Sequence, residues 1–128
     1  MAKKKIFIAD DQEDVLLLLK DFLDKHDFEV MAVKEPKNVF LSVVSYKPDL
    51  ILLDLLMPDL GGFEICEILN KNLQTREIPI IIISGFGDAT DIKKAYCLGA
   101  VGYLVKPFAL GSLFTEITKI ITNKESKL

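Results

Sequence analysis

The chain has 128 residues, 50% hydrophobic and 27% charged, which is the size and composition of one globular domain. Its 16 basic and 19 acidic residues give a net charge of −3, which argues against a nucleic-acid-binding surface because such surfaces concentrate positive charge. No apolar run approaches the ~18 residues needed to cross a membrane, and residues 6–9 are too short for the core of a signal peptide. We therefore expect a single cytoplasmic domain over residues 1–128, in which Cys66 and Cys97 are reduced and buried.

Short apolar segments alternate with amphipathic segments along the whole chain. Continuous apolar or β-branched runs are typical of strands buried on both faces, and they predict strands at residues 5–9, 50–53, 79–83 and 100–105. Residues 28–33 alternate weakly between apolar and polar and predict an outer strand. Apolar residues at helical spacing predict helices at residues 12–25, 36–47, 61–72, 88–98 and 111–122, followed by a polar tail over 123–128. Five strands alternating with five helices predict an α/β domain with a single doubly wound, five-stranded parallel sheet of the flavodoxin-like kind.

The same spacing predicts which side chains of the helices face the sheet. For the first and third helices these are Val15, Leu18, Leu19 and Phe22, and Ile65, Ile68 and Leu69.

Polar residues stand at or just after the ends of four predicted strands. They are Asp10, Asp11, Asp54, Ser84 and Lys106. Because the carboxyl ends of parallel strands meet at one edge of the sheet, we expect these side chains to converge. Three neighbouring carboxylates repel one another and favour a bound cation, and oxygen ligands are those that Mg²⁺ prefers. An ammonium and a hydroxyl group suit the oxygens of a phosphoryl group.

Asp54 is the residue most suited to covalent chemistry. It follows the apolar run at residues 50–53 and precedes a turn signal at Met57 and Pro58. An aspartate carboxylate can attack phosphorus and form an aspartyl-phosphate. Each polar residue also has a purely structural explanation: an aspartate at the end of a strand often caps a turn or helix, and a lysine before proline is often solvated. His26, the only histidine, is expected to be a surface or capping residue.

The motifs together resemble the response-regulator receiver domain of two-component signalling. The resemblance extends from Lys5 to the last helix and rests on the segments Asp10-Asp11, Asp54 to Gly62, Ser84-Gly85 and Gly99 to Phe108. It implies a signalling switch rather than a turnover enzyme. Asp54 would take a phosphoryl group from a phosphohistidine on a sensor kinase or a histidine phosphotransfer protein.

The resemblance also assigns roles to the other residues. Mg²⁺ would be bound by Asp11, Asp54 and the backbone carbonyl of Leu56, and Asp10 would help to bind it through water. Ser84 and Lys106 would contact the phosphoryl oxygens, and the Lys106-Pro107 peptide would be cis. Movement of Ser84 would vacate space for Tyr103 and reshape the surface of the fourth helix, fifth strand and fifth helix. That surface would control a downstream protein or output domain, in a monomer or a weak dimer formed through it.

Two positions depart from what is common in the family. Leu56, two residues after Asp54, and Phe86, two residues after Ser84, are apolar where polar side chains often stand. With no polar group to orient the hydrolytic water, we expect slow self-dephosphorylation.

Two other functions would require different sequence features. A phosphatase with an aspartyl-phosphate intermediate would carry its nucleophile in an Asp-x-Asp motif after the first strand, where this chain has adjacent aspartates. A nucleotide- or flavin-binding module would need a glycine-rich loop there. A pseudo-receiver, which binds partners without phosphorylation, stays open, as does the question whether the domain acts alone or within a longer regulator.

Overall fold

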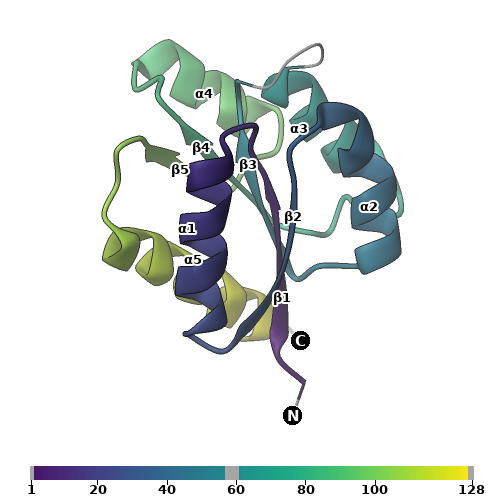
Figure 1. Cartoon of the computed structure of the whole chain (residues 1–128). Helices are drawn as coiled ribbons and strands as arrows, with labels where there is room; N and C mark the ends of the chain where they lie inside the picture. Colours follow the sequence, from purple (N-terminus) through teal and green to yellow (C-terminus); the bar gives the residue numbers. More distant parts are fainter. Residues whose placement is uncertain (1, 57–60, 127–128) are drawn as a thin grey trace.

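The computed structural model describes residues 2–56 and 61–126 (Figure 1). Five parallel strands form one sheet in the order β2-β1-β3-β4-β5. The strands are β1 (Lys4–Ala9), β2 (Phe28–Val33), β3 (Leu50–Asp54), β4 (Ile80–Ser84) and β5 (Gly102–Val105). The predicted doubly wound, flavodoxin-like α/β fold is confirmed. The turn expected at Met57 and Pro58 lies outside the described residues.

Helices cover both faces of the sheet. They are α1 (Glu13–Asp24), α2 (Val39–Tyr46), α3 (Gly62–Lys71), α4 (Ala89–Cys97) and α5 (Leu110–Ser126). Helices α1 and α5 lie on one face of the sheet, and α2, α3 and α4 lie on the other (Figure 1). Each set of helices shares one hydrophobic cluster with the sheet. Within the described part of the chain, no helix combines the length and the apolar character needed to cross a membrane.

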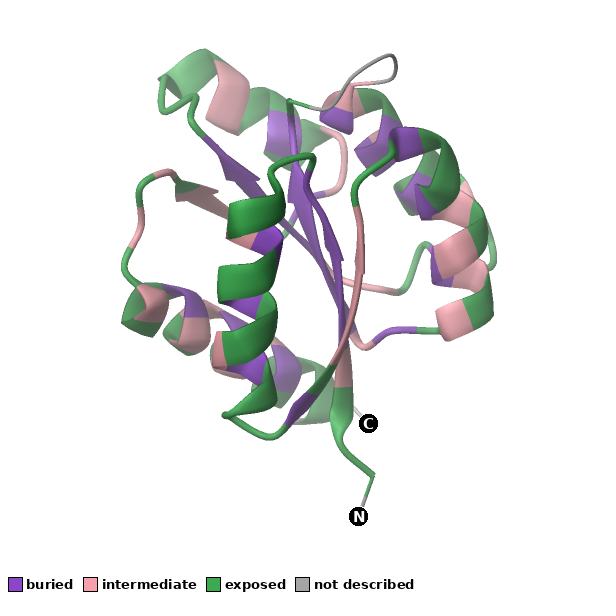
Figure 2. Cartoon of the chain, in the orientation of Figure 1, coloured by how far each residue is buried: buried purple, intermediate pink, exposed green. Residues whose placement is uncertain are grey.

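The two strands β3 and β4 are buried along their whole length. Successive side chains of a strand point to opposite faces, so Leu50 and Leu52 join the cluster under α1 and α5, while Ile51 and Leu53 join the other. Figure 2 shows this buried centre and the exposed outer sides of the helices. Full burial of one such side chain stabilises the fold by about 1.5–3 kcal/mol. Packing on both faces of β3 therefore fixes the position of Asp54, the last residue of the strand.

The buried face of α1 differs from the prediction. Leu16, Leu19 and Leu23 are buried, whereas Leu18 is 55% exposed. Four consecutive leucines at positions 16–19 fit two neighbouring helical stripes equally well, so the spacing alone did not select the right one. The shift turns Leu18 toward the edge of the sheet where the polar residues gather.

Smaller differences concern burial and helix boundaries. In α3, Cys66 is buried as predicted. Ile68, which was predicted to face the sheet, is 44% exposed. The expectation that Cys97 is buried is wrong, since it is exposed. A short 3-10 turn, Pro36–Asn38, precedes α2, and α5 continues to Ser126, beyond the predicted end at residue 122.

Gly62 lets the start of α3 approach the end of β3. Its amide N–H donates a hydrogen bond to the carbonyl oxygen of Leu55 at 3.0 Å. A Cβ atom at Gly62 would lie 2.5 Å from both the Asp54 carbonyl oxygen and the Leu55 Cα. These are backbone atoms that cannot rotate away, so only glycine fits without displacing the segment that carries Asp54.

We expect Gly62→Ala to destabilise the domain by about 1–3 kcal/mol, because the clash forces the backbone of β3 or α3 to shift. Urea denaturation would measure the change. Gly111→Ala is the matched control: a Cβ there meets nothing within 4 Å, and the position is inside α5. The control should be neutral or more stable by up to about 1 kcal/mol. Equal stability of the two variants would contradict the expected clash.

Candidate functional site

The four strand ends carrying polar residues meet at one edge of the sheet. Asp10 follows β1, Asp54 ends β3, Ser84 ends β4, and Lys106 follows β5. Asp54 pairs with Ile83 and Ser84 with Val105, so Ser84 lies one step beyond Asp54 on the neighbouring strand. Asp10, Asp54 and Ser84 are buried, which is unusual for charged groups without a functional or structural partner.

Asp10, Asp11 and Asp54 form an acidic cluster. Each contributes a carboxylate oxygen, and these oxygens all lie within 4.8 Å of one another. Burial, and next the charge of Asp10, raises the pKa of Asp54 to about 6, although the Leu56 amide and Lys106 act in the opposite direction. A cation among these oxygens would relieve the repulsion, and all-oxygen ligation suits Mg²⁺. The donor set therefore fits the magnesium site that the sequence predicts.

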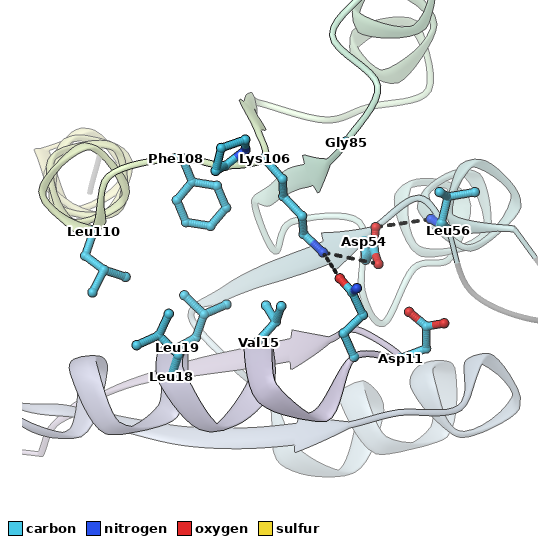
Figure 3. A pocket seen from close by; sticks show the side chains of 12 residues that line it. Asp11, Val15, Leu18, Leu19, Asp54, Leu56, Gly85, Lys106, Phe108 and Leu110 are labelled. Carbon is cyan, nitrogen blue, oxygen red and sulfur yellow. Dashed lines mark hydrogen bonds and ion pairs between the residues drawn. The ribbon is translucent and has the colours of Figure 1, made fainter.

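Lys106 is the cation that the chain itself supplies to the cluster. Its Nζ lies 2.8 Å from Asp10 Oδ2. It also lies 3.6 Å from Asp54 Oδ2 and 3.1 Å from Gln12 Oε1 (Figure 3). The Lys106 amide donates to the Ser84 carbonyl oxygen at 2.7 Å, which ties the residue to the end of β4. The Lys106-Pro107 peptide is cis, as expected.

Asp54 also makes the hydrogen bond of an ordinary turn-capping aspartate. Its Oδ1 accepts from the Leu56 amide at 3.2 Å. That bond alone would leave the other carboxylate oxygen free to face water. Instead the side chain is buried, and Oδ2 faces Lys106. A turn-capping role thus accounts for Oδ1 of Asp54 but not for the position of Oδ2.

Ser84 and Tyr103 hold the same backbone segment from two sides. Ser84 Oγ accepts from the Phe86 amide at 3.0 Å, and the Tyr103 hydroxyl donates to the Phe86 carbonyl oxygen at 2.5 Å. Burial raises the pKa of the Tyr103 hydroxyl, which favours its protonated, hydrogen-bond-donating form. Sequence reasoning selected Ser84 and Tyr103 but missed that Phe86 connects them through its backbone, because backbone contacts leave no side-chain signal.

A cavity of about 670 Å³ joins the acidic cluster to an apolar wall. Asp54, Asp11 and Lys106 lie at its polar end, and Figure 3 shows the apolar side chains of α1 and the start of α5 grouped away from Asp54. The wall comprises Val15, Leu18, Leu19, Phe108 and Leu110. The sequence analysis assigned the α1 residues to the core and so did not predict this wall.

Gln12 and His26 lie at the two ends of α1. His26 is exposed at the end of α1, and its Nδ1 lies 2.8 Å from the Phe22 carbonyl oxygen, as expected for a surface or capping residue. Gln12, which the sequence analysis passed over, contacts Lys106 although it directly follows the acidic pair. The only feature of the sequence that could have indicated this contact is the position of Gln12 directly after Asp11.

Comparison with known proteins agrees with this geometry. The family model described as "Response regulator receiver domain" matches residues 6–118. The chain belongs to the response regulator receiver domain family. Receiver domains are signalling switches rather than turnover enzymes, and they pair with histidine kinases and with output domains.

Sequence relatives are longer than this receiver domain. It is 32% identical over 119 residues to the probable transcriptional regulator ycf27 of Galdieria sulphuraria, covering 93% of this chain and 46% of that protein. It is 30% identical over 122 residues to the alkaline phosphatase synthesis transcriptional regulatory protein PhoP of Bacillus subtilis, covering 95% of this chain and 50% of that protein. The chain thus spans about half the length of these curated relatives.

Solved structures share the fold. A CheY-like receiver domain protein of Methanospirillum hungatei superposes with a TM-score of 0.92 at 23% identity, covering 98% of this chain and 99% of that one. A two-component response regulator of Clostridium difficile gives a TM-score of 0.87 at 26% identity, covering 94% and 97%.

The raised pKa of Asp54 predicts a stability cost. Because folded Asp54 binds its proton more tightly than the unfolded chain does, ionisation disfavours folding, and the cost is absent below the ordinary pKa of 3.8 and complete above about 6. In metal-free buffer we expect Asp54→Asn to be more stable than the parent at pH 7.5, by on the order of 1–3 kcal/mol, and the gain to shrink toward pH 4.

Urea denaturation at the two pH values measures this difference. Asp24→Asn, at an exposed aspartate near the end of α1, should change stability by no more than about 0.5 kcal/mol at either pH. A parent protein as stable as Asp54→Asn at pH 7.5 would show that Asp54 carries no such cost.

Proposed function

We propose that Asp54 is the phosphoacceptor of this receiver domain. The observation that carries the proposal is the arrangement of its buried carboxylate, with one oxygen held by the Leu56 amide and the other 3.6 Å from the Lys106 ammonium group. Asp10 and Asp11 complete an oxygen cluster beside it. A nucleophile, a fixed positive charge and a cation site within one cavity are the parts that phosphoryl transfer needs.

The chemistry at Asp54 is a displacement at phosphorus. An oxygen of the Asp54 carboxylate forms a bond to phosphorus as the P–N bond of a phosphohistidine breaks, and the bond's electron pair stays on the ring nitrogen. We infer that Asp10, Asp11, Asp54 and the Leu56 carbonyl hold Mg²⁺. The metal would offset the negative charges that approach one another in the transfer. Lys106 would pair with a phosphoryl oxygen, and the Ser84 hydroxyl would hydrogen-bond another.

The donor in this proposal is a histidine kinase or a histidine phosphotransfer protein. A phosphohistidine must reach Asp54 through the open cavity, one wall of which is the apolar wall described above. The exposed Leu18 on that wall offers the donor protein an apolar contact next to the reacting group. The free cysteines Cys66 and Cys97 agree with a cytoplasmic location, where thiols stay reduced.

We infer that phosphorylation is passed on through the Phe86 segment. If Ser84 turns its hydroxyl to the phosphoryl group, it releases the Phe86 amide, and Tyr103 moves with the Phe86 carbonyl that it holds. Pro107 follows Lys106 directly, so movement of Lys106 reaches the start of α5 as well. The surface of α4, β5 and α5, where Tyr96, Val101 and Val105 are exposed, would then bind an output domain, a downstream protein or a second copy.

The proposal predicts a covalent modification of one residue. On incubation with acetyl phosphate and Mg²⁺, intact mass should rise by one phosphoryl group, whereas neither Asp54→Ala nor the protein in excess chelator should change. Asp49→Ala, which replaces a carboxylate at the opposite end of β3, is the matched control and should still be modified. A protein unmodified in every condition would refute the proposal and favour a pseudo-receiver.

Slow loss of the phosphoryl group is a second prediction. Leu56 and Phe86, which would flank the path of the hydrolytic water, are 54% and 42% exposed and offer it no polar side chain. Leu56→Asn should shorten the lifetime of the aspartyl-phosphate by at least about threefold, as followed by intact mass after removal of the donor. Leu41→Asn, at a 72% exposed leucine of α2, should leave the lifetime unchanged. An unchanged lifetime in Leu56→Asn would contradict the explanation.

A further inference from the structure

Gln12 closes a ring of hydrogen bonds with Asp10 and Lys106. The Gln12 amide N–H donates to Asp10 Oδ1 at 2.9 Å, and Asp10 Oδ2 accepts from Lys106 Nζ at 2.8 Å. The same Nζ donates to Gln12 Oε1 at 3.1 Å. Two of these three bonds join Lys106 to the segment that follows β1, and the Gln12 side chain supplies one of the two.

The Gln12 side chain has no other role in the described structure. Gln12 stands at the N-cap position of α1, but its side chain makes no capping hydrogen bond. It is exposed, so it adds nothing to the core. Within residues 2–56 and 61–126, its side chain hydrogen-bonds to Lys106 alone. A purely structural function for the amide group therefore has little to support it.

Lys106 needs a hydrogen-bond acceptor that stays available when a cation occupies the acidic cluster. Its other short contact is Asp10, which also belongs to the cluster suited to a cation. A cation that draws on the Asp10 carboxylate weakens the Asp10–Lys106 pair, because two positive charges then share one anion. A lysine side chain without partners rotates freely and is rarely aimed in one direction. The Gln12 oxygen remains as an acceptor in that state.

A neutral acceptor suits this task better than a carboxylate would. The amide oxygen holds the ammonium group without neutralising it, so the charge of Lys106 stays available for an anion at Asp54. It also adds no negative charge that would repel an approaching phosphoryl donor.

We propose that Gln12 is a positioning residue that keeps the Lys106 ammonium group directed at Asp54 while Asp10 is engaged with a cation. The inference rests on the proposed function, since it concerns the step in which Lys106 meets the phosphoryl group. Gln12 would then affect the rate of phosphorylation only by positioning Lys106.

The first test is a double-mutant cycle on the phosphorylation rate. Gln12→Met keeps the length of the side chain and removes its acceptor; with acetyl phosphate and saturating Mg²⁺ it should be slower than the parent by roughly fivefold. In a Lys106→Met background the same change should alter the rate by less than about twofold. Gln74→Met, the same substitution in an exposed turn after α3, should equal the parent.

Each result of the cycle bears on the proposal. Equal rates for Gln12→Met and the parent would overturn it, and so would a fivefold loss that persists in the Lys106→Met background. Failure of the parent itself to be phosphorylated would count against the proposed function instead, which keeps the two failures distinct.

A second test observes the contact directly and requires no turnover. The sequence contains two glutamines, Gln12 and Gln74, so glutamine-selective isotope labelling gives two side-chain carbonyl signals, which Gln74→Met assigns. With Mg²⁺ bound, Lys106→Met should shift the Gln12 signal and leave the Gln74 signal in place. An unmoved Gln12 signal would show that the two side chains are not in contact in the loaded site and would overturn the proposal.

Discussion

A carboxylate buried beside another carboxylate is the interaction to which the rest of this domain is adapted. Asp54 and Asp10 are both withdrawn from water, and the pKa of Asp54 is raised to about 6 as a result. Such a pair is unfavourable unless positive charge lies close by. Lys106 provides that charge from the far end of the chain, and the third carboxylate, Asp11, makes the cluster suitable for a divalent cation.

The hydrophobic core is what makes this arrangement possible. The strands β3 and β4 are buried on both faces, so their ends cannot move outward to relieve the repulsion between charges. The close approach of Gly62 to the backbone of Asp54 and Leu55 removes the remaining freedom on the α3 side. The apolar burial of the sheet, worth a few kcal/mol for each side chain, therefore outweighs an electrostatic cost at one edge of it.

The fold and the convergence of the site residues could be predicted because both depend on strong, local signals. A run such as residues 50–53 predicts a strand buried on both faces, and the parallel topology then brings Asp10, Asp54, Ser84 and Lys106 to one edge. The buried stripe of α1 could not be predicted, since four successive leucines leave the helical phase undetermined. The parts played by Gln12 and the Phe86 backbone depend on contacts between distant segments, and no pattern in the sequence specifies these.

The same contacts explain how a local charge change can reach a distant surface. Ser84 and Tyr103 lie on neighbouring strands, yet each holds the peptide groups of Phe86, one through the amide and the other through the carbonyl. The segment after β4 therefore cannot keep both hydrogen bonds if Ser84 turns toward Asp54. Since Tyr103 belongs to β5 and the segment leads into α4, release of the Phe86 amide by Ser84 would reach two of the three elements of the α4, β5 and α5 surface. The third, α5, begins just after Lys106 and Pro107, so the charge that neutralises Asp54 is connected to it by the chain itself.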